Sequence, residues 1–147
     1  MIPMSEVRTE KTAWRWLGFS FLIGGILDGV FGVAILVAAE PAAAWLHLTL
    51  PIPRVYFDLN GLFLVALGAI YLLIARDPRR LAPVATVATL LRFGGFALFF
   101  SDLVMGRAED AFAWIGLMDG IFAVVHLLLL RRAAGGLLAA LHREAFP

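Results

Sequence analysis

The sequence predicts an all-α fold, an integral membrane four-helix up-and-down bundle with its N- and C-termini in the cytoplasm. Of the 147 residues, 62% are hydrophobic and 16% are charged, and the mean hydropathy is +0.91. These values differ strongly from those of water-soluble domains. The apolar residues form four long blocks interrupted by proline, glycine and charge, and most basic residues fall on one side of the resulting threading.

The four blocks predict one domain over residues 1–147, with spans at about residues 16–38, 55–75, 81–100 and 111–130. Each block holds roughly 20 residues, which at about 1.5 Å per residue cross a hydrocarbon core of about 30 Å. Between the first two spans, residues 41–53 are bounded by prolines and predict a short amphipathic segment on the outer surface. The tail from Ala133 is compatible with either a short interfacial helix or disorder.

The distribution of lysine and arginine predicts the orientation. Nine cations fall on one side of the threading, namely Arg8, Lys11, Arg15, Arg76, Arg79, Arg80, Arg131, Arg132 and Arg143. Only Arg54 and Arg107 fall on the other side. By the positive-inside rule the first side is cytoplasmic, and an even number of spans returns the C-terminus to it.

Four polar residues inside the spans form a predicted cluster. Asp28, Arg92 and Asp119 each lie about a dozen residues, or roughly 18 Å at helical rise, from the cytoplasmic end of their helix. Asn60 lies about one turn further out. A charge at mid-membrane costs about 2.5–3.5 kcal/mol, and a guanidinium has enough donors to hold two carboxylates. We therefore expect the four side chains to face one another.

This cluster has two interpretations that the sequence leaves open. It either fixes the register of the bundle as a structural feature, or it binds a ligand or protons. His126 lies seven residues after Asp119 and hence on the same helical face, where it is a candidate proton relay.

The first and fourth spans share the pattern Gly-x-x-Asp-Gly-x-Phe-x-Val, at residues 25–33 and 116–124. The similarity indicates an old internal duplication. Its glycines, Gly25 with Gly29 and Gly116 with Gly120, form small-xxx-small patches that allow helix backbones to approach closely. We expect them to serve helix packing.

Several kinds of chemistry are excluded or have no motif. The chain has no cysteine, which excludes disulfides, thiolate metal sites and thiol–disulfide exchange by the chain itself. The net charge of +1 gives no general affinity for nucleic acid. No metal-ligand spacing, phosphate-binding loop or nucleophilic constellation is present. The sequence therefore identifies no metal site, no catalytic residue and no cofactor.

With its polar, glycine-rich helices, the basic link at residues 76–80 and its small size, the whole chain resembles the DoxX-like group of four-helix bacterial membrane proteins. The resemblance implies a multi-pass protein of the bacterial cytoplasmic (inner) membrane. Some members of that group are linked to membrane redox or quinone-associated complexes, so the resemblance also points to a quinone-linked role. It transfers no catalytic residues to this chain.

These observations favour a non-catalytic protein, either an accessory subunit of a larger membrane complex or a binder of a small amphiphile between its helices. Two alternatives stay open. One is a proton-coupled transporter or channel that uses Asp28, Arg92 and Asp119, and the other is a quinone-linked oxidoreductase that uses the same region. The expected partners are the lipid bilayer and either other membrane subunits or further copies of the chain.

Overall fold

The computed structural model describes residues 4–142, with side chains from residue 9 onward, and this part of the chain is helical between short connections. The helices are α1 (Met4–Val37), α2 (Ala39–Leu46), α3 (Val55–Arg76), α4 (Ala82–Val104), α5 (Ala111–Ala134) and α6 (Leu137–Leu141). Four of them, α1, α3, α4 and α5, are long and apolar enough to cross a membrane, with mean hydropathies between 1.6 and 2.2. The predicted all-α class and the four long apolar helices are confirmed.

The helices extend beyond the apolar blocks. α1 begins at Met4, since the residues before Trp16 include glutamate, lysine and arginine, which favour helix, and α4 continues past Phe100 to Val104. α2 begins two residues before the expected surface segment and covers its first six residues, and the tail contains the short helix α6. α5 ends at Ala134 and is capped by Gly135, which has a left-handed φ of 86° and donates its N–H to the carbonyl oxygen of Arg131 at 3.1 Å. Arg143 lies outside the described residues, as does the side chain of Arg8.

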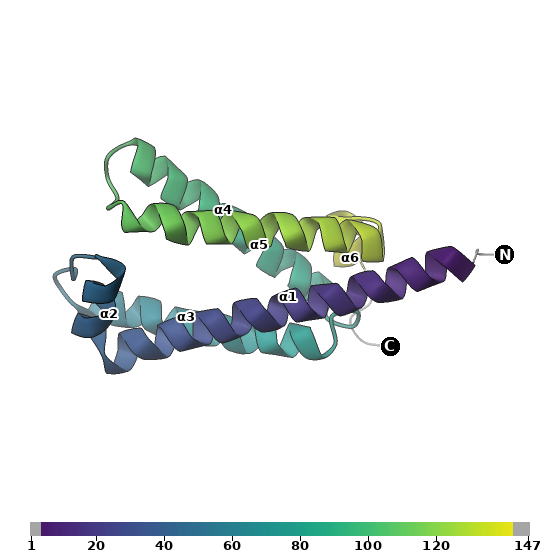
Figure 1. Ribbon diagram of the computed structural model, residues 1–147, viewed down its shortest axis with the longest axis horizontal. Coiled ribbons are helices and arrows are strands. Elements are labelled where there is room, and N and C mark those ends of the chain that lie inside the picture. Colours follow the sequence, from purple (N-terminus) through teal and green to yellow (C-terminus); the bar gives the residue numbers. More distant parts are fainter. Residues whose placement is uncertain (1–3, 143–147) are drawn as a thin grey trace.

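The long helices form two antiparallel pairs, α1 with α3 and α4 with α5 (Figure 1). α1 packs along α3 and also along α5, so it joins the two pairs. α3 and α4 have little contact beyond the turn that connects them. α1 begins at the end of the bundle where α6 lies, as an even number of long helices requires.

Small residues on facing sides bring α1 and α3 together. They recur every seven residues on each helix, so that they meet in antiparallel register. The three facing pairs are Gly18 with Ala75, Gly25 with Gly68, and Gly32 with Gly61. A methyl group on Gly32 would lie 2.6 Å from the carbonyl oxygen of Gly61, and one on Gly25 would lie 2.9 Å from that of Gly68. Only glycine permits this backbone-to-backbone contact.

The glycines of the repeated pattern therefore have different surroundings. Gly25 contacts the backbone of α3, but a methyl group on Gly29 would meet nothing within 4 Å. On α5, Gly116 and Gly120 face the rings of Phe99 and Phe96 rather than another backbone. The backbones of Gly25 and Gly29 nevertheless both lie against Gly68, where a methyl group would be 2.8 Å from the Gly25 carbonyl oxygen and 2.9 Å from the Gly29 nitrogen. The four-residue pair on α1 therefore packs against α3 within the seven-residue register.

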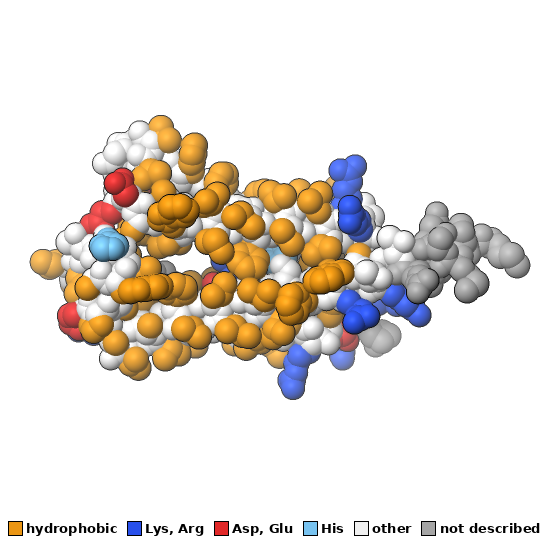
Figure 2. Space-filling view, viewed as in Figure 1, with side chains coloured by type: hydrophobic (Ala, Val, Ile, Leu, Met, Phe, Trp, Pro, Cys, Tyr) orange, Lys and Arg blue, Asp and Glu red, His pale blue; other side chains and the backbone are white. Residues whose placement is uncertain are grey.

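The surface of the bundle is apolar between two charged ends (Figure 2). Each long helix exposes large apolar side chains, for example Val30, Phe63, Leu91 and Leu128, each more than half exposed. The end with α6 carries Arg15, Arg76, Arg79, Arg131 and Arg132 and is called the basic end. The opposite end carries Glu40, Asp58, Asp102, Glu109 and Asp110 and is called the acidic end.

Gly32→Ala is expected to destabilise the protein by about 1–3 kcal/mol, because the α1–α3 contact has no room for a methyl group and overpacking costs this much. Gly29→Ala is the matched control on the same helix, and it should be neutral or slightly stabilising since alanine is the better helix former. Thermal unfolding of both purified variants beside the wild type measures the difference. Equal losses in the two variants would contradict the seven-residue packing.

Candidate functional site

Two aspartates from different helices bind one arginine inside the bundle. The Arg92 guanidinium, from α4, donates through Nη2 to Asp28 Oδ2 of α1 at 2.6 Å. Through Nη1 it donates to Asp119 Oδ1 of α5. The side chains of Asp28, Arg92 and Asp119 are 10%, 11% and 15% exposed. We call these three residues the ion triad.

Aromatic rings frame the guanidinium. The Arg92 Cζ atom lies 4.9 Å from the ring centre of Tyr71 on α3 and 5.2 Å from that of Phe122 on α5. Both distances are within cation–π range. Arg92 thereby contacts all three other long helices, through two carboxylates and two rings. These contacts replace much of the hydration that the guanidinium loses on burial.

Glycines make space for this arrangement. A methyl group on Gly95 would lie 2.5 Å from Asp119 Oδ2, and one on Gly24 would lie 3.5 Å from Arg92 Nη2. The absence of a side chain at Gly95 therefore allows Asp119 to lie against α4, where it reaches Arg92.

Some polar atoms of the triad have hydrogen-bond partners and others have none. Arg92 Nε is buried and has no partner among the described residues. Asp28 and Asp119 each use one carboxylate oxygen toward Arg92, and their other oxygens accept no hydrogen bond from the described part of the chain. With both carboxylates ionised, the triad carries one net negative charge. Its open groups are two carboxylate oxygens, which accept hydrogen bonds, and Arg92 Nε, which donates.

The triad joins the two helix pairs, which separate from each other at one end of the bundle. Toward the acidic end, α4 and α5 diverge from α1 and α3 (Figure 1). Figure 2 shows a hollow in the apolar surface between the pairs, with charged side chains visible inside it. Because Asp28 belongs to one pair and Asp119 to the other, Arg92 connects the two pairs at this point.

Asn60 does not join the triad. It is exposed on α3, and no hydrogen bond in the described structure links it to Asp28, Arg92 or Asp119. The expectation for Asn60 came from its depth along the helix. α3 has little contact with α4 beyond the turn that connects them, so the exposed Asn60 side chain has no facing partner among the described residues.

His126 lies among aromatic rings rather than in a polar chain. It is fully buried, stacks on Phe21 with ring centres 3.9 Å apart, and lies 5.8 Å from the Phe122 ring. Neither of its ring nitrogens has a partner among the described residues. Phe21 also packs edge-on against Tyr71. These rings form an apolar layer between the triad and the basic end.

The sequence reasoning missed the aromatic partners of Arg92. A signal existed for Phe122, because the repeated pattern places a phenylalanine three residues after each aspartate and hence on nearly the same helical face. No comparable signal existed for Tyr71, whose role depends on how α3 packs against α1.

The acidic end is closed by contacts between two connections. The backbone N–H of Thr49, after α2, donates to both carboxylate oxygens of Glu109, before α5, at 3.1 and 3.0 Å.

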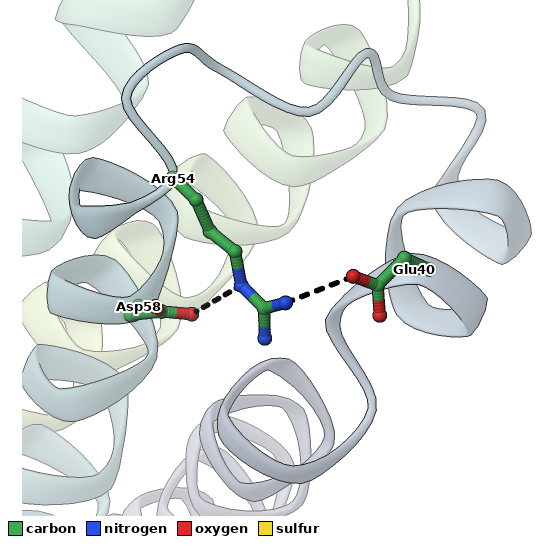
Figure 3. A network of polar contacts seen from close by, with 3 residues as sticks. All are labelled: Glu40, Arg54 and Asp58. Carbon is green, nitrogen blue, oxygen red and sulfur yellow. Dashed lines mark hydrogen bonds and ion pairs between the residues drawn. The ribbon is translucent and has the colours of Figure 1, made fainter.

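Arg54 pairs with Glu40 at 2.8 Å and with Asp58 at 3.3 Å, which ties α2 to the start of α3 (Figure 3). All three side chains of this network are more than two fifths exposed, so the pairs contribute little stability.

The described residues contain no group of three or more histidine, aspartate or glutamate side chains that could hold a metal ion.

The chain matches no protein-family model, and it has no significant match among curated proteins or solved structures. The resemblance to the DoxX-like group therefore stays a prediction.

Arg92→Gln is expected to lower the free energy of unfolding by about 3–5 kcal/mol, because it leaves two buried carboxylates without a counter-charge. Arg107→Gln is the control. It breaks a pair with Asp102 in which Arg107 is 60% exposed, and such pairs contribute about 0–1 kcal/mol. Denaturant titration of both variants in the same detergent compares them, and a small loss for Arg92→Gln would contradict the role assigned to the triad.

The contact between Glu109 and Thr49 should depend on pH. Hydrogen bonding from Thr49 favours the charged carboxylate and holds the pKa of Glu109 below its usual range. The stabilisation is therefore complete above the usual glutamate pKa and is lost as the pH falls through the lowered value. The amide NMR shift of Thr49 should titrate with that low midpoint and stay flat in Glu109→Gln. A midpoint at or above the usual glutamate value would refute the contact.

Proposed function

We propose that this chain is a multi-pass protein of the bacterial cytoplasmic membrane with both termini in the cytoplasm. Four helices of sufficient length and hydropathy support the insertion, as do the large apolar side chains that these helices expose. The concentration of arginine at the basic end supports placing that end in the cytoplasm.

We further propose that the protein is a non-catalytic binder of a small amphiphile, held between the two helix pairs at the ion triad. The observation that carries this proposal is the unequal use of the triad. Two carboxylates face one guanidinium, and each carboxylate has one oxygen without a partner among the described residues.

The chemistry of these open oxygens selects the ligand. They are acceptors beside a net negative charge, so they favour a head group that donates hydrogen bonds and carries positive charge. An amine meets both conditions. An oxidised quinone presents only carbonyl acceptors, for which the triad offers one open donor, the buried Arg92 Nε, so it fits the two open carboxylate oxygens less well than an amine does. The apolar walls between the diverging helix pairs suit a hydrocarbon body, as in most small-molecule sites.

Proton-coupled transport is the second candidate, because a proton bound to one carboxylate neutralises the net negative charge of the triad, as a bound amine would. The ring nitrogens of His126, which have no partner among the described residues, also favour proton transport, but less than the charge of the triad does. Phe122 lies between that histidine and Asp119 along α5, and Phe21 stacks on the histidine, so the path lacks the hydrogen-bonded chain that proton relays use.

The test compares dodecylamine, dodecanol and dodecanoate as probes in lipid nanodiscs, with thermal unfolding as the readout. A ligand that binds only the folded protein raises its apparent stability. We expect stabilisation in the order amine, alcohol, acid. Asp119→Asn should abolish the advantage of the amine, whereas Asp102→Asn, at the exposed pair with Arg107, should preserve it.

Equal stabilisation by the three probes, or an amine advantage that survives Asp119→Asn, would overturn the proposed ligand class. Transport is measured separately with the wild-type protein in liposomes that contain a pH-sensitive dye. Proton flux lost in Asp119→Asn, without any amine advantage, would favour the transporter.

A further inference from the structure

A groove at the basic end lies apart from the ion triad. It runs between α1 and α3, has a volume of about 760 Å³, and shares no lining residue with the triad or its aromatic neighbours. Small-molecule sites commonly have volumes of roughly 300–1,000 Å³. The groove therefore has the size of a ligand site, and neither the triad nor the proposed amphiphile accounts for it.

Three arginines stand at one end of this groove. Arg15 comes from α1, Arg76 ends α3, and Arg79 lies in the turn before α4. No ion pair in the described part of the chain includes any of them. The neighbouring acid, Asp77, accepts the backbone N–H of Arg80 at 3.1 Å. The mouth of the groove thus concentrates positive charge without an internal counter-ion.

The rest of the groove is apolar and open to the side. Phe19, Leu22 and Leu73 line it with side chains that are 53%, 39% and 55% exposed. Gly18 and Ala75 form its floor, where α1 and α3 approach closely without large side chains between them. This shape suits a linear hydrocarbon chain that lies along the helices.

We propose that this groove binds an anionic phospholipid from the surrounding leaflet, with the phosphate at Arg15, Arg76 and Arg79 and an acyl chain along the apolar floor. Guanidinium groups bind phosphate oxygens through paired hydrogen bonds, and basic pockets between helices on the cytoplasmic side hold anionic head groups. The inference depends on membrane insertion. It does not depend on a ligand at the triad, which favours the opposite charge.

Native mass spectrometry of the delipidated protein tests the proposal with two added lipids, phosphatidylglycerol and phosphatidylcholine, that have identical acyl chains. We expect the wild type to retain the anionic lipid preferentially. Arg76→Gln/Arg79→Gln should reduce that preference roughly thirtyfold, from a factor of about five for each arginine. The control, Arg80→Gln/Arg131→Gln, removes the same charge from the same end at positions that do not line the groove.

Three results would overturn the proposal. An absent head-group preference in the wild type would do so, and it needs no variant. An equal loss of head-group preference in the control variant would show that the anionic lipid is attracted by the charge of the whole basic end and not by the groove. Displacement of the lipid by millimolar inorganic phosphate would show a free-anion site instead. Monodisperse elution of both double variants in gel filtration verifies that they fold, and the amine test at the triad stays independent of every outcome.

Discussion

One buried guanidinium connects the two halves of this protein. Arg92 binds Asp28 on α1 and Asp119 on α5 while the rings of Tyr71 and Phe122 flank it. Removing these charges from water is costly, and only mutual pairing with good geometry offsets that cost. The pairing therefore constrains the relative position of all four long helices. It also leaves one negative charge uncompensated, and from that imbalance the proposed chemistry of the site follows.

The packing around the triad is uneven. α1 and α3 meet through glycine and alanine every seven residues and touch backbone to backbone. The pair of α4 and α5 is spaced by phenylalanine rings against Gly116 and Gly120, and it diverges from the first pair toward the acidic end. The tightly packed pair of α1 and α3 is linked through Arg92 to the diverging pair of α4 and α5. This arrangement leaves a hollow between the pairs, which a uniformly packed bundle would fill with side chains. Hydrogen bonds from Thr49 to Glu109 link the two connections at that end.

The sequence predicted the number of long helices and the meeting of Asp28, Arg92 and Asp119, because helix length and depth follow from counting residues at a fixed rise. Depth alone does not determine which way a side chain faces. Asn60 has a suitable depth but no facing helix, and Tyr71 reaches Arg92 only because of how α3 packs on α1. The seven-residue register of the small residues between α1 and α3 was not predicted, since it depends on a partner helix that one helix alone does not reveal.

The most direct test of the central claim measures the distance between the two helix pairs. The chain has no cysteine, so spin labels attach only at cysteines introduced at Leu62 on α3 and Leu117 on α5, both exposed. Pulsed electron spin resonance in lipid bilayers should give one narrow distance distribution in the otherwise wild-type protein and in Arg107→Gln. It should give a broad, longer distribution in Arg92→Gln. An unchanged narrow distribution in Arg92→Gln would show that the ion triad does not hold the pairs together.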